Sequence, residues 1–225
     1  LALKEKAQKF AQEKIKPIAT ETEKNRMFSF EVIKEMGKLG FLGMMVPKEY
    51  GGQGESYLNY MVVLEEIAKA DASHSSVMAL HNSLFSYPVI TYGTEEQKKT
   101  YLPGICTAEK FCAFALSEPN AGSDAASIET TTTKVGSDYI INGTKIFVTN
   151  GNVADFILVY AVTDNGKKAH GITVFLVEKD TPGFQVGTIE RKMGFKASPT
   201  CELIFQDVKV PETAILGKLN EGFKI

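Results

Sequence analysis

The spacing of apolar residues changes near the middle of the chain and divides the sequence into two parts. In the first part, apolar residues recur every three or four positions, which is the period of one face of an α-helix. The first such stripe consists of Leu3, Ala7, Phe10, Ala11, Ile15 and Ile18. This spacing predicts an amphipathic helix. Pro17 should end or kink it, because proline lacks the N–H group that an interior helical residue donates.

Two further helices follow from the same kind of pattern. Ser29 is suited to cap the start of the second helix, and Gly40 to close it. A loop rich in helix breakers at residues 47–54 separates it from the third helix. The third helix places Glu65 and Glu66 opposite an apolar stripe made of Tyr57, Tyr60, Met61, Leu64, Ile67 and Ala68.

A fourth apolar helix is predicted from about Ser75 to the region of Pro88, and a shorter helix comes after it. Thr94 and Gln97 stand three residues apart, which is the spacing of a capping box at a helix N-terminus. The Pro-Gly pair at residues 103–104 predicts the turn that follows this short helix.

From about Phe111 the apolar pattern becomes that of strands. Asn142-Gly143 stands between two apolar runs, which is the strongest short-range signal for a hairpin. Asn165-Gly166 separates two further apolar runs, and Pro182-Gly183 predicts another turn. Several short strands joined by turns are typical of an antiparallel barrel or sandwich.

Helices followed by strands, rather than alternating with them, predict an α+β fold. We therefore expect an N-terminal all-α helical domain at residues 1–111 and a middle antiparallel β-barrel or sandwich domain at residues 112–225. The chain has 225 residues, of which 44% are hydrophobic, so it can bury a sizeable core.

Composition excludes several classes of partner and site. The formal net charge is −2 and no strongly basic block is present, which argues against nucleic acid or an anionic membrane as the main partner. The cysteines and histidines lack the spacing of a disulfide framework or a metal site. No window approaches the roughly 18 apolar residues that cross a bilayer. A reducing compartment fits best.

The candidate chemistry lies where the first strand should end, at residues 114–124, with the sequence Phe-Ala-Leu-Ser-Glu-Pro-Asn-Ala-Gly-Ser-Asp. Small residues there allow a ligand to approach the backbone closely. Exposed N–H groups and serine hydroxyls suit a pyrophosphate or a polarised carbonyl. An ordinary turn with a capping Asp124 explains the same residues equally well. Neither a Rossmann nor a P-loop nucleotide motif is present.

The run from Ala115 to Asp124, continuing to Ser127, resembles the signature of the acyl-CoA dehydrogenase family. The resemblance extends over the whole chain, and its motifs occur in the family's order. They are residues 93–98 and 101–103 before the β domain, residues 142–145 leading to 148–150, and residues 205–208, 210–211 and 216–217 near the end. Several separate motifs make this a specific match.

The resemblance implies an FAD site on the β domain. The strand from Phe114 to Ser117 should lie along the flavin ring. Ser117 should form a hydrogen bond with the ring, and Thr149 should donate a hydrogen bond near the flavin N5. Ser123 should reach the flavin pyrophosphate or the substrate's pantetheine. The residues expected to bind FAD are Phe114, Leu116, Ser117, Gly122, Ser123, Phe147, Val148 and Thr149. Ser123 is also the expected substrate-binding residue.

The chain departs from the family pattern at Phe147, where members commonly have Trp before the Val/Ile-Thr pair. An aromatic ring is kept, but the indole N–H is lost. The only carboxylate in the signature run before Asp124 is Glu118, and the resemblance assigns it a structural role. The family's catalytic base is a Glu on a third, helical domain, which would begin where this chain stops at Ile225. The fragment alone is therefore expected to contain no catalytic residue and to be inactive.

The implied reaction is the α,β-dehydrogenation of a short-chain acyl-CoA thioester, with electrons passing to an electron-transferring flavoprotein. The family lines its acyl pocket with the helix bearing Met78, Leu80, His81 and Leu84, and bulk from Leu80, Phe85 or Tyr87 would shorten that pocket. Simple packing between helices explains these side chains equally well. The resemblance also implies a homotetramer of the full-length protein. The lack of a visible transit peptide predicts a bacterial, cytoplasmic source. An acyl-CoA oxidase or flavin monooxygenase on the same scaffold, or a non-catalytic flavin- or CoA-binding homologue, remains open.

Overall fold

The computed structural model describes all 225 residues, and the chain divides into two compact units. The helical unit contains Leu1–Ile90, Glu95–Phe111 and Arg191–Pro199. The sheet unit contains Thr91–Thr94, Cys112–Glu190 and Thr200–Ile225. The predicted order of helices followed by a mostly antiparallel sheet is confirmed.

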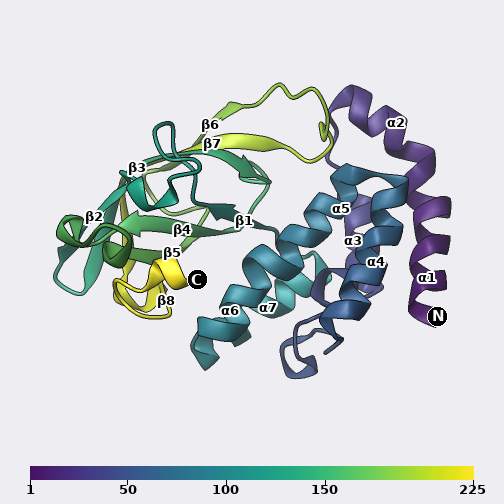
Figure 1. Cartoon of the computed structure of the whole chain (residues 1–225), viewed down its shortest axis with the longest axis horizontal. Coiled ribbons are helices and arrows are strands. Elements are labelled where there is room, and N and C mark those ends of the chain that lie inside the picture. The colour runs from purple at the N-terminus through teal and green to yellow at the C-terminus, as the bar shows by residue number, and fades with distance from the viewer. The chain divides into compact units, whose positions relative to one another are not determined.

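The first predicted stripe forms the N-terminal helices, whose inner face is buried. Helix α1 (Ala2–Phe10) continues through a π-helical stretch (Ala11–Ile15) into α2 (Lys16–Asn25), at the labelled N-terminus of Figure 1. Pro17 does not end the helix, but the regular α-helix is interrupted just before it by the π-helical stretch. Pro17 lies in the first turn of α2, where a residue needs no N–H partner within the helix. The wider π-helical turn before it absorbs the irregularity.

Helix α3 (Phe30–Lys38) starts after Ser29 and is followed by Gly40 in the left-handed region, as predicted, although the Ser29 hydroxyl makes no capping hydrogen bond. Helix α4 (Tyr57–Ala70) differs from its prediction, because its buried face is turned towards Val63 and includes Glu66. Glu66 is only 3% exposed, and its carboxylate is paired with Lys69 at 2.8 Å and Lys4 at 3.5 Å. These two cations offset the cost of burying the charge.

The fourth predicted helix is present as α5 (Ala72–Ala79), a π-helical stretch (Leu80–Ser86) and α6 (Tyr87–Tyr92). Helix α7 (Glu95–Thr107) runs through Pro103, so the predicted turn at residues 103–104 was wrong. An interior proline costs about 3 kcal/mol. Leu102 and Ile105 are fully buried on the same helix, and each contributes roughly 2 kcal/mol, which outweighs that cost.

The sheet unit is an eight-stranded sheet. Its strands are β1 (Cys112–Ala115), β2 (Thr131–Val135), β3 (Asp138–Thr149), β4 (Phe156–Val162), β5 (Ile172–Glu178), β6 (Phe184–Ile189), β7 (Thr200–Pro211) and β8 (Ile215–Leu216). The order is β6-β7-β3-β2-β4-β5-β8, with β1 also paired to β4. Most pairs are antiparallel, whereas β1 and β2 each meet β4 in the parallel direction.

The predicted hairpin at Asn142-Gly143 is not present, because both residues lie inside β3. The register of β3 against β7 shifts between Ile141 and Gly143, so the pair forms an irregularity in a continuous strand. The hairpin turn joins β2 to β3 instead, around Gly136. The Asn165-Gly166 and Pro182-Gly183 predictions were right, since these pairs lie between β4 and β5 and between β5 and β6.

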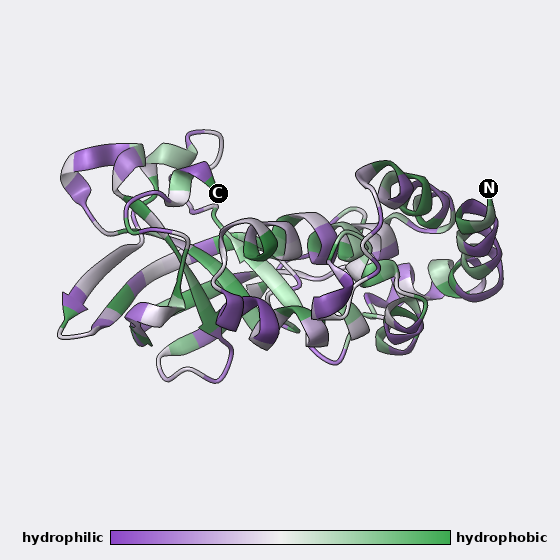
Figure 2. Ribbon diagram, turned by 90° about the horizontal axis from the view of Figure 1, so that it is seen from below, coloured by the Kyte–Doolittle hydropathy of each residue, from purple (hydrophilic) through white to green (hydrophobic).

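The core of the sheet unit comes from residues that alternate along the strands. Its buried members include Ala113 and Ala115 of β1, Ile157 and Val159 of β4, and Leu203 of β7. Figure 2 shows the hydrophobic residues in green along these strands, while the helix at the N-terminus carries both green and purple residues. Burial alternates along most of β7, whereas β4 and β5 are buried on both faces over nearly their whole length.

Candidate functional site

Strand β1 presents one predicted site residue on the face away from the core, and a second follows the strand. Ala113 and Ala115 point into the core, so Phe114 points the other way, and both Phe114 and Leu116, which comes directly after β1, are only half-buried. The Phe114 ring packs against Tyr160 of β4, with ring centroids 5.0 Å apart. The position of Phe114 is therefore set by the neighbouring strand.

The loop that follows β1 begins with a tight turn. The N–H of Glu118 donates to the carbonyl of Ala121 at 3.0 Å, and the Ala121 N–H donates back at 3.1 Å. The two residues after Ala121 are exposed. A Cβ placed on Gly122 would meet nothing within 4 Å, so the backbone there is open to a ligand. Ser123 lies beside it.

The end of β3 is bulged, and the bulge turns an aromatic ring outwards. The register against β7 shifts between Lys145 and Val148, and Phe147 has φ 56°. This left-handed backbone is uncommon for a bulky residue and costs on the order of 1 kcal/mol. Phe147 is 63% exposed, whereas Val148 is 1% exposed and points into the core. Thr149 is half-buried and pairs with Thr200.

The loop after β1 and the end of β3 lie side by side. The Ile146 N–H donates to the carbonyl of Ser117 at 2.8 Å. This bond places Ser117 next to the bulge that carries Phe147. We call the set Phe114, Leu116, Ser117, Phe147 and Thr149 the β1–β3 surface. Of the remaining predicted residues, Val148 contributes backbone only, and Gly122 and Ser123 belong to the loop.

Glu118 has a structural role, because its side chain is buried and hydrogen-bonded within the protein. Its carboxylate is buried and accepts hydrogen bonds from the N–H groups of Glu129 and Thr130 and from Lys145. Burial raises the pKa of the carboxyl group, but the hydrogen bonds from Lys145, Thr130 and Glu129 outweigh burial, and the pKa is lowered. A base that abstracts a weakly acidic proton needs the opposite shift.

Lys145 is the functional-site residue that the sequence reasoning missed. Its side chain is 0% exposed, and its Nζ donates to the Leu116 carbonyl at 3.0 Å and to Glu118 Oε1 at 2.7 Å. A signal was available, because Lys145 falls on the same odd-numbered positions of the strand as Tyr139 and Ile141, and a buried lysine is almost always paired. The adjacent motif at residues 114–124 contains two acidic residues that could serve as that partner, Glu118 and Asp124, and the structure pairs Lys145 with Glu118.

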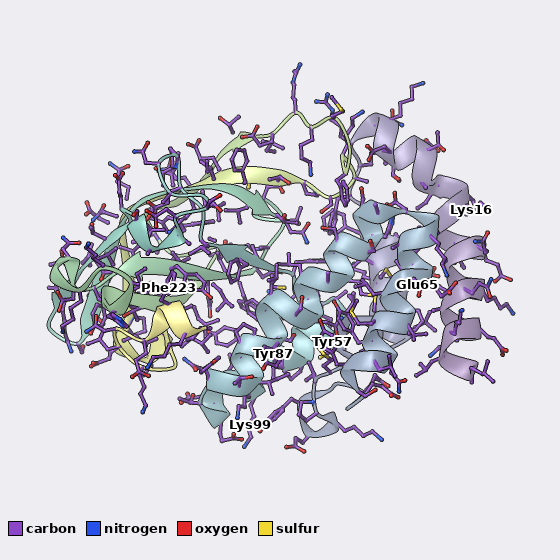
Figure 3. The ribbon with its side chains drawn as sticks, in the orientation of Figure 1. Lys16, Tyr57, Glu65, Tyr87, Lys99 and Phe223 are labelled. Atoms are coloured by element: carbon purple, nitrogen blue, oxygen red, sulfur yellow. The ribbon has the colours of Figure 1, made fainter.

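The helix expected to line an acyl pocket divides into a buried and an exposed set. Leu80, His81 and Phe85 are 0–2% exposed and pack within the helical unit. Leu84 is 45% exposed and Tyr87 is 55% exposed; Figure 3 labels Tyr87. Of the three bulky side chains considered, Tyr87 is therefore the one that reaches the surface of the unit.

Family models cover nearly the whole chain. Residues 1–109 match the acyl-CoA dehydrogenase N-terminal domain, and residues 113–208 match the acyl-CoA dehydrogenase middle domain. The chain belongs to the acyl-CoA dehydrogenase family. A short-chain specific acyl-CoA dehydrogenase from Clostridium acetobutylicum is 40% identical over 99% of this chain and 59% of the relative.

Solved structures of the same family superpose closely. Butyryl-CoA dehydrogenase from Megasphaera elsdenii has a TM-score of 0.95 at 41% identity, covering 99% of this chain and 59% of that one. A chain in the structure of the electron transferring flavoprotein of Acidaminococcus fermentans has a TM-score of 0.97 at 43% identity, with 99% and 59% coverage. This acyl-CoA dehydrogenase family chain thus spans about 59% of the length of these proteins.

The residues of the β1–β3 surface and its loop fit a flavin. The hydroxyls of Ser117, Ser123 and Thr149 make no hydrogen bond within the protein, so they are free for a ligand. The open space at Gly122 and the exposed ring of Phe147 add close backbone approach and an apolar contact.

Among the helices, none is both long enough and apolar enough to cross a membrane.

Proposed function

We propose that the full-length protein is an FAD-dependent acyl-CoA dehydrogenase that converts a short-chain acyl-CoA thioester into the 2-enoyl-CoA. The observation that carries this proposal is the bond from Ile146 to Ser117, which joins the signature loop to the bulge of β3. It gathers unpartnered hydroxyls and an exposed aromatic ring on one surface. Family membership supports the oxidoreductase class.

In this proposal Phe114, Leu116 and Phe147 provide apolar contact to the ring of FAD and exclude water from it. Ser117 and Thr149 donate hydrogen bonds to polar atoms of the ring. Ser123 and the open backbone at Gly122 hold the flavin pyrophosphate or the pantetheine of the substrate. When bound, FAD supplies the acceptor for the β-hydride of the thioester. The protein's part is to bind and orient both molecules.

The base that removes the α-proton lies outside these residues in our proposal. Glu118 is excluded because its carboxylate is already bonded to Lys145, Glu129 and Thr130 and its pKa is lowered. The fragment alone is therefore predicted to be inactive. A Glu on the remaining helices of the full-length protein would provide the base.

A short acyl chain is supported by the names of the relatives, which include a short-chain specific dehydrogenase and a butyryl-CoA dehydrogenase. An electron-transferring flavoprotein is the proposed electron acceptor, supported by the match to a chain in such a structure. We also propose a homotetramer for the full-length protein, which light scattering after size exclusion would test.

The test uses the purified full-length protein. We expect a yellow protein with FAD bound. Its absorbance should bleach under anaerobic butyryl-CoA and much less under octanoyl-CoA, and it should recover when electron-transferring flavoprotein is added. A colourless protein that does not take up added FAD would refute the proposal. Residues 1–225 assayed alone serve as the control and should show no turnover.

Phe147 in place of tryptophan is the observation that favours a second candidate, an acyl-CoA oxidase on the same scaffold. The ring at this position is exposed, and the smaller side chain covers less of a bound flavin. If the reduced protein reacts with O₂ faster than it passes electrons to the flavoprotein, the oxidase is correct. A protein that binds FAD but is not bleached by any acyl-CoA would be a binding homologue.

A further inference from the structure

The buried cation Lys145 has no part in the chemistry described above, although burying its charge costs a large amount of folding free energy. Moving an ammonium group out of water costs several kcal/mol even in real proteins, unless nearby groups offset the loss. Lys145 is 0% exposed and is among the largest fully buried side chains of the chain. A methionine or leucine would fill the same space at lower cost.

The two acceptors of Lys145 lie on either side of Ser117. Its Nζ donates to the carbonyl of Leu116 at 3.0 Å and to Glu118 Oε1 at 2.7 Å. The next residue of β3, Ile146, donates its N–H to the carbonyl of Ser117 at 2.8 Å. Three consecutive residues after β1 are thus bound to two consecutive residues of β3.

These bonds are needed because the ladder between β1 and β4 stops at Ala115. Beyond that residue no strand pairing holds the chain against β4. The bonds from Lys145 and Ile146 replace the ladder over the three residues that lead into the signature loop. They also join that loop to the β3 bulge at the residue where the register against β7 is lost.

Glu118 extends the same connection to the far end of the loop. Its carboxylate accepts the N–H of Thr130 at 3.0 Å and the N–H of Glu129. The loop that presents Gly122 and Ser123 is therefore closed at both ends by one carboxylate, and that carboxylate is held by Lys145. We call the pair the Lys145–Glu118 clamp.

The electrostatics agree with a charged clamp at neutral pH. Burial lowers the pKa of Lys145 to about 8, while the neighbouring Glu118 carboxylate works against that shift. The pKa of Glu118 is lowered by its hydrogen bonds despite burial. Both groups are therefore ionised at pH 7, and the short contact between them is an ion pair.

We propose that Lys145 is a positioning residue for the proposed flavin site, where its ammonium fixes Ser117 relative to Phe147 and Thr149. This inference rests on the proposed function. Lys145 does not touch substrate or the ring of the flavin. It acts through the carbonyl of Leu116 and the carboxylate of Glu118, and its loss lets the loop and the bulge move apart.

The test compares two variants of the full-length protein with the wild type. Lys145→Met alone leaves a buried unpaired carboxylate and is expected to unfold the protein. The informative variant is Lys145→Met with Glu118→Gln, which is neutral, preserves volume and keeps an amide oxygen for one of the two N–H groups, since Thr130 donates to Oε1 and Glu129 to Oε2 of the carboxylate. Lys209→Met is the matched control, because it removes an exposed ion pair with Asp138 at 2.8 Å in the same sheet.

For the double variant we expect a folded protein by far-ultraviolet circular dichroism. The dissociation constant for FAD should rise by about tenfold or more, because hydrogen-bond donors that are out of position lose on the order of one hydrogen bond to the flavin. The visible circular dichroism of the bound flavin should change, and kcat should fall about tenfold while KM changes less than about threefold. Lys209→Met should match the wild type in each measurement.

A folded double variant with wild-type FAD affinity, flavin dichroism and kcat would overturn the inference and leave the proposed function intact. If the double variant does not fold, Glu118→Asp replaces it. This change keeps both charges but withdraws the carboxylate, so FAD affinity should fall in the same direction, and unchanged affinity would overturn the inference. A wild-type protein that binds no FAD would instead refute the proposed function.

Discussion

Asn142 of β3 and Asp207 of β7 bind each other through two hydrogen bonds across the sheet. The Asn142 Nδ2 donates to Asp207 Oδ1 at 3.0 Å, and the Asp207 N–H donates to Asn142 Oδ1 at 2.8 Å. Asp207 has φ 52°, so the bonds hold an uncommon backbone in place. The side chain that would favour a turn in isolation is used here to bind the neighbouring strand.

Gly143, which follows Asn142, should not tolerate a side chain. A Cβ would lie 2.4 Å from Thr130 Oγ1 and 2.7 Å from Thr130 Cα, and its φ is 153°. We expect Gly143→Ala to lower the free energy of unfolding by about 2–4 kcal/mol, because backbone must move to relieve the clash. Urea unfolding measures this. Gly194→Ala is the control, since nothing lies within 4 Å there, and equal effects of the two changes would contradict the prediction.

His81 should make stability depend on pH. Its Nδ1–H donates to the Ile105 carbonyl at 3.2 Å, and its Nε2 is buried without a partner. Burial lowers the pKa of His81 from 6.5 to about 4, while the hydrogen bond to Ile105 opposes that shift. The unfolded chain therefore binds a proton first as pH falls, and stability is lost between pH 6.5 and 4.

The expected loss between pH 7 and pH 5 is roughly 2 kcal/mol from this group. Urea unfolding of the full-length protein at both values measures it. His81→Gln has no proton to gain and should flatten the dependence by that amount. His170→Gln, at an exposed position, should leave the dependence unchanged. If both variants behave alike, His81 is not the cause.

Thr149 tests the proposed hydrogen bond to the flavin. Its hydroxyl has no partner in the protein, so Thr149→Val should leave folding unchanged. We expect kcat to fall about tenfold, because one hydrogen bond to a developing charge contributes roughly 1.4 kcal/mol. Steady-state assays with butyryl-CoA measure this. Thr133→Val makes the same change on the exposed strand β2, and a comparable loss there would show that the effect is not local.

Phe147→Trp restores the aromatic residue that is common at this position in the family. The larger ring should cover more of the flavin and slow the reaction of the reduced protein with O₂, which stopped-flow absorbance follows. Stability should change by less than about 0.5 kcal/mol, because Phe147 is 63% exposed. Phe195→Trp is the matched control, with 52% exposure and a similar positive φ. An equal change in both variants would contradict the prediction.

Local patterns predicted most elements of this fold. The stripe that includes Ala7 and Ile15 predicted the first helix, and Pro182-Gly183 predicted the turn before β6. Two of the failures share a cause, which is that tertiary contacts outweighed a local preference. Pro103 stayed inside a helix because its neighbours are buried, and Asn142-Gly143 stayed inside a strand because Asp207 and Thr130 occupy its surroundings.

The class of fold, the family and the position of the signature loop could be predicted from the chain, because they depend on periodicity and on motifs that are contiguous in it. The burial of Lys145, the hydrogen bonds of its ammonium to Leu116 and Glu118, and the inward direction of Val148 became visible only in the folded protein. Such contacts join residues about 30 positions apart. Their partners depend on strand register and on a bulge, and neither can be read from neighbouring residues alone.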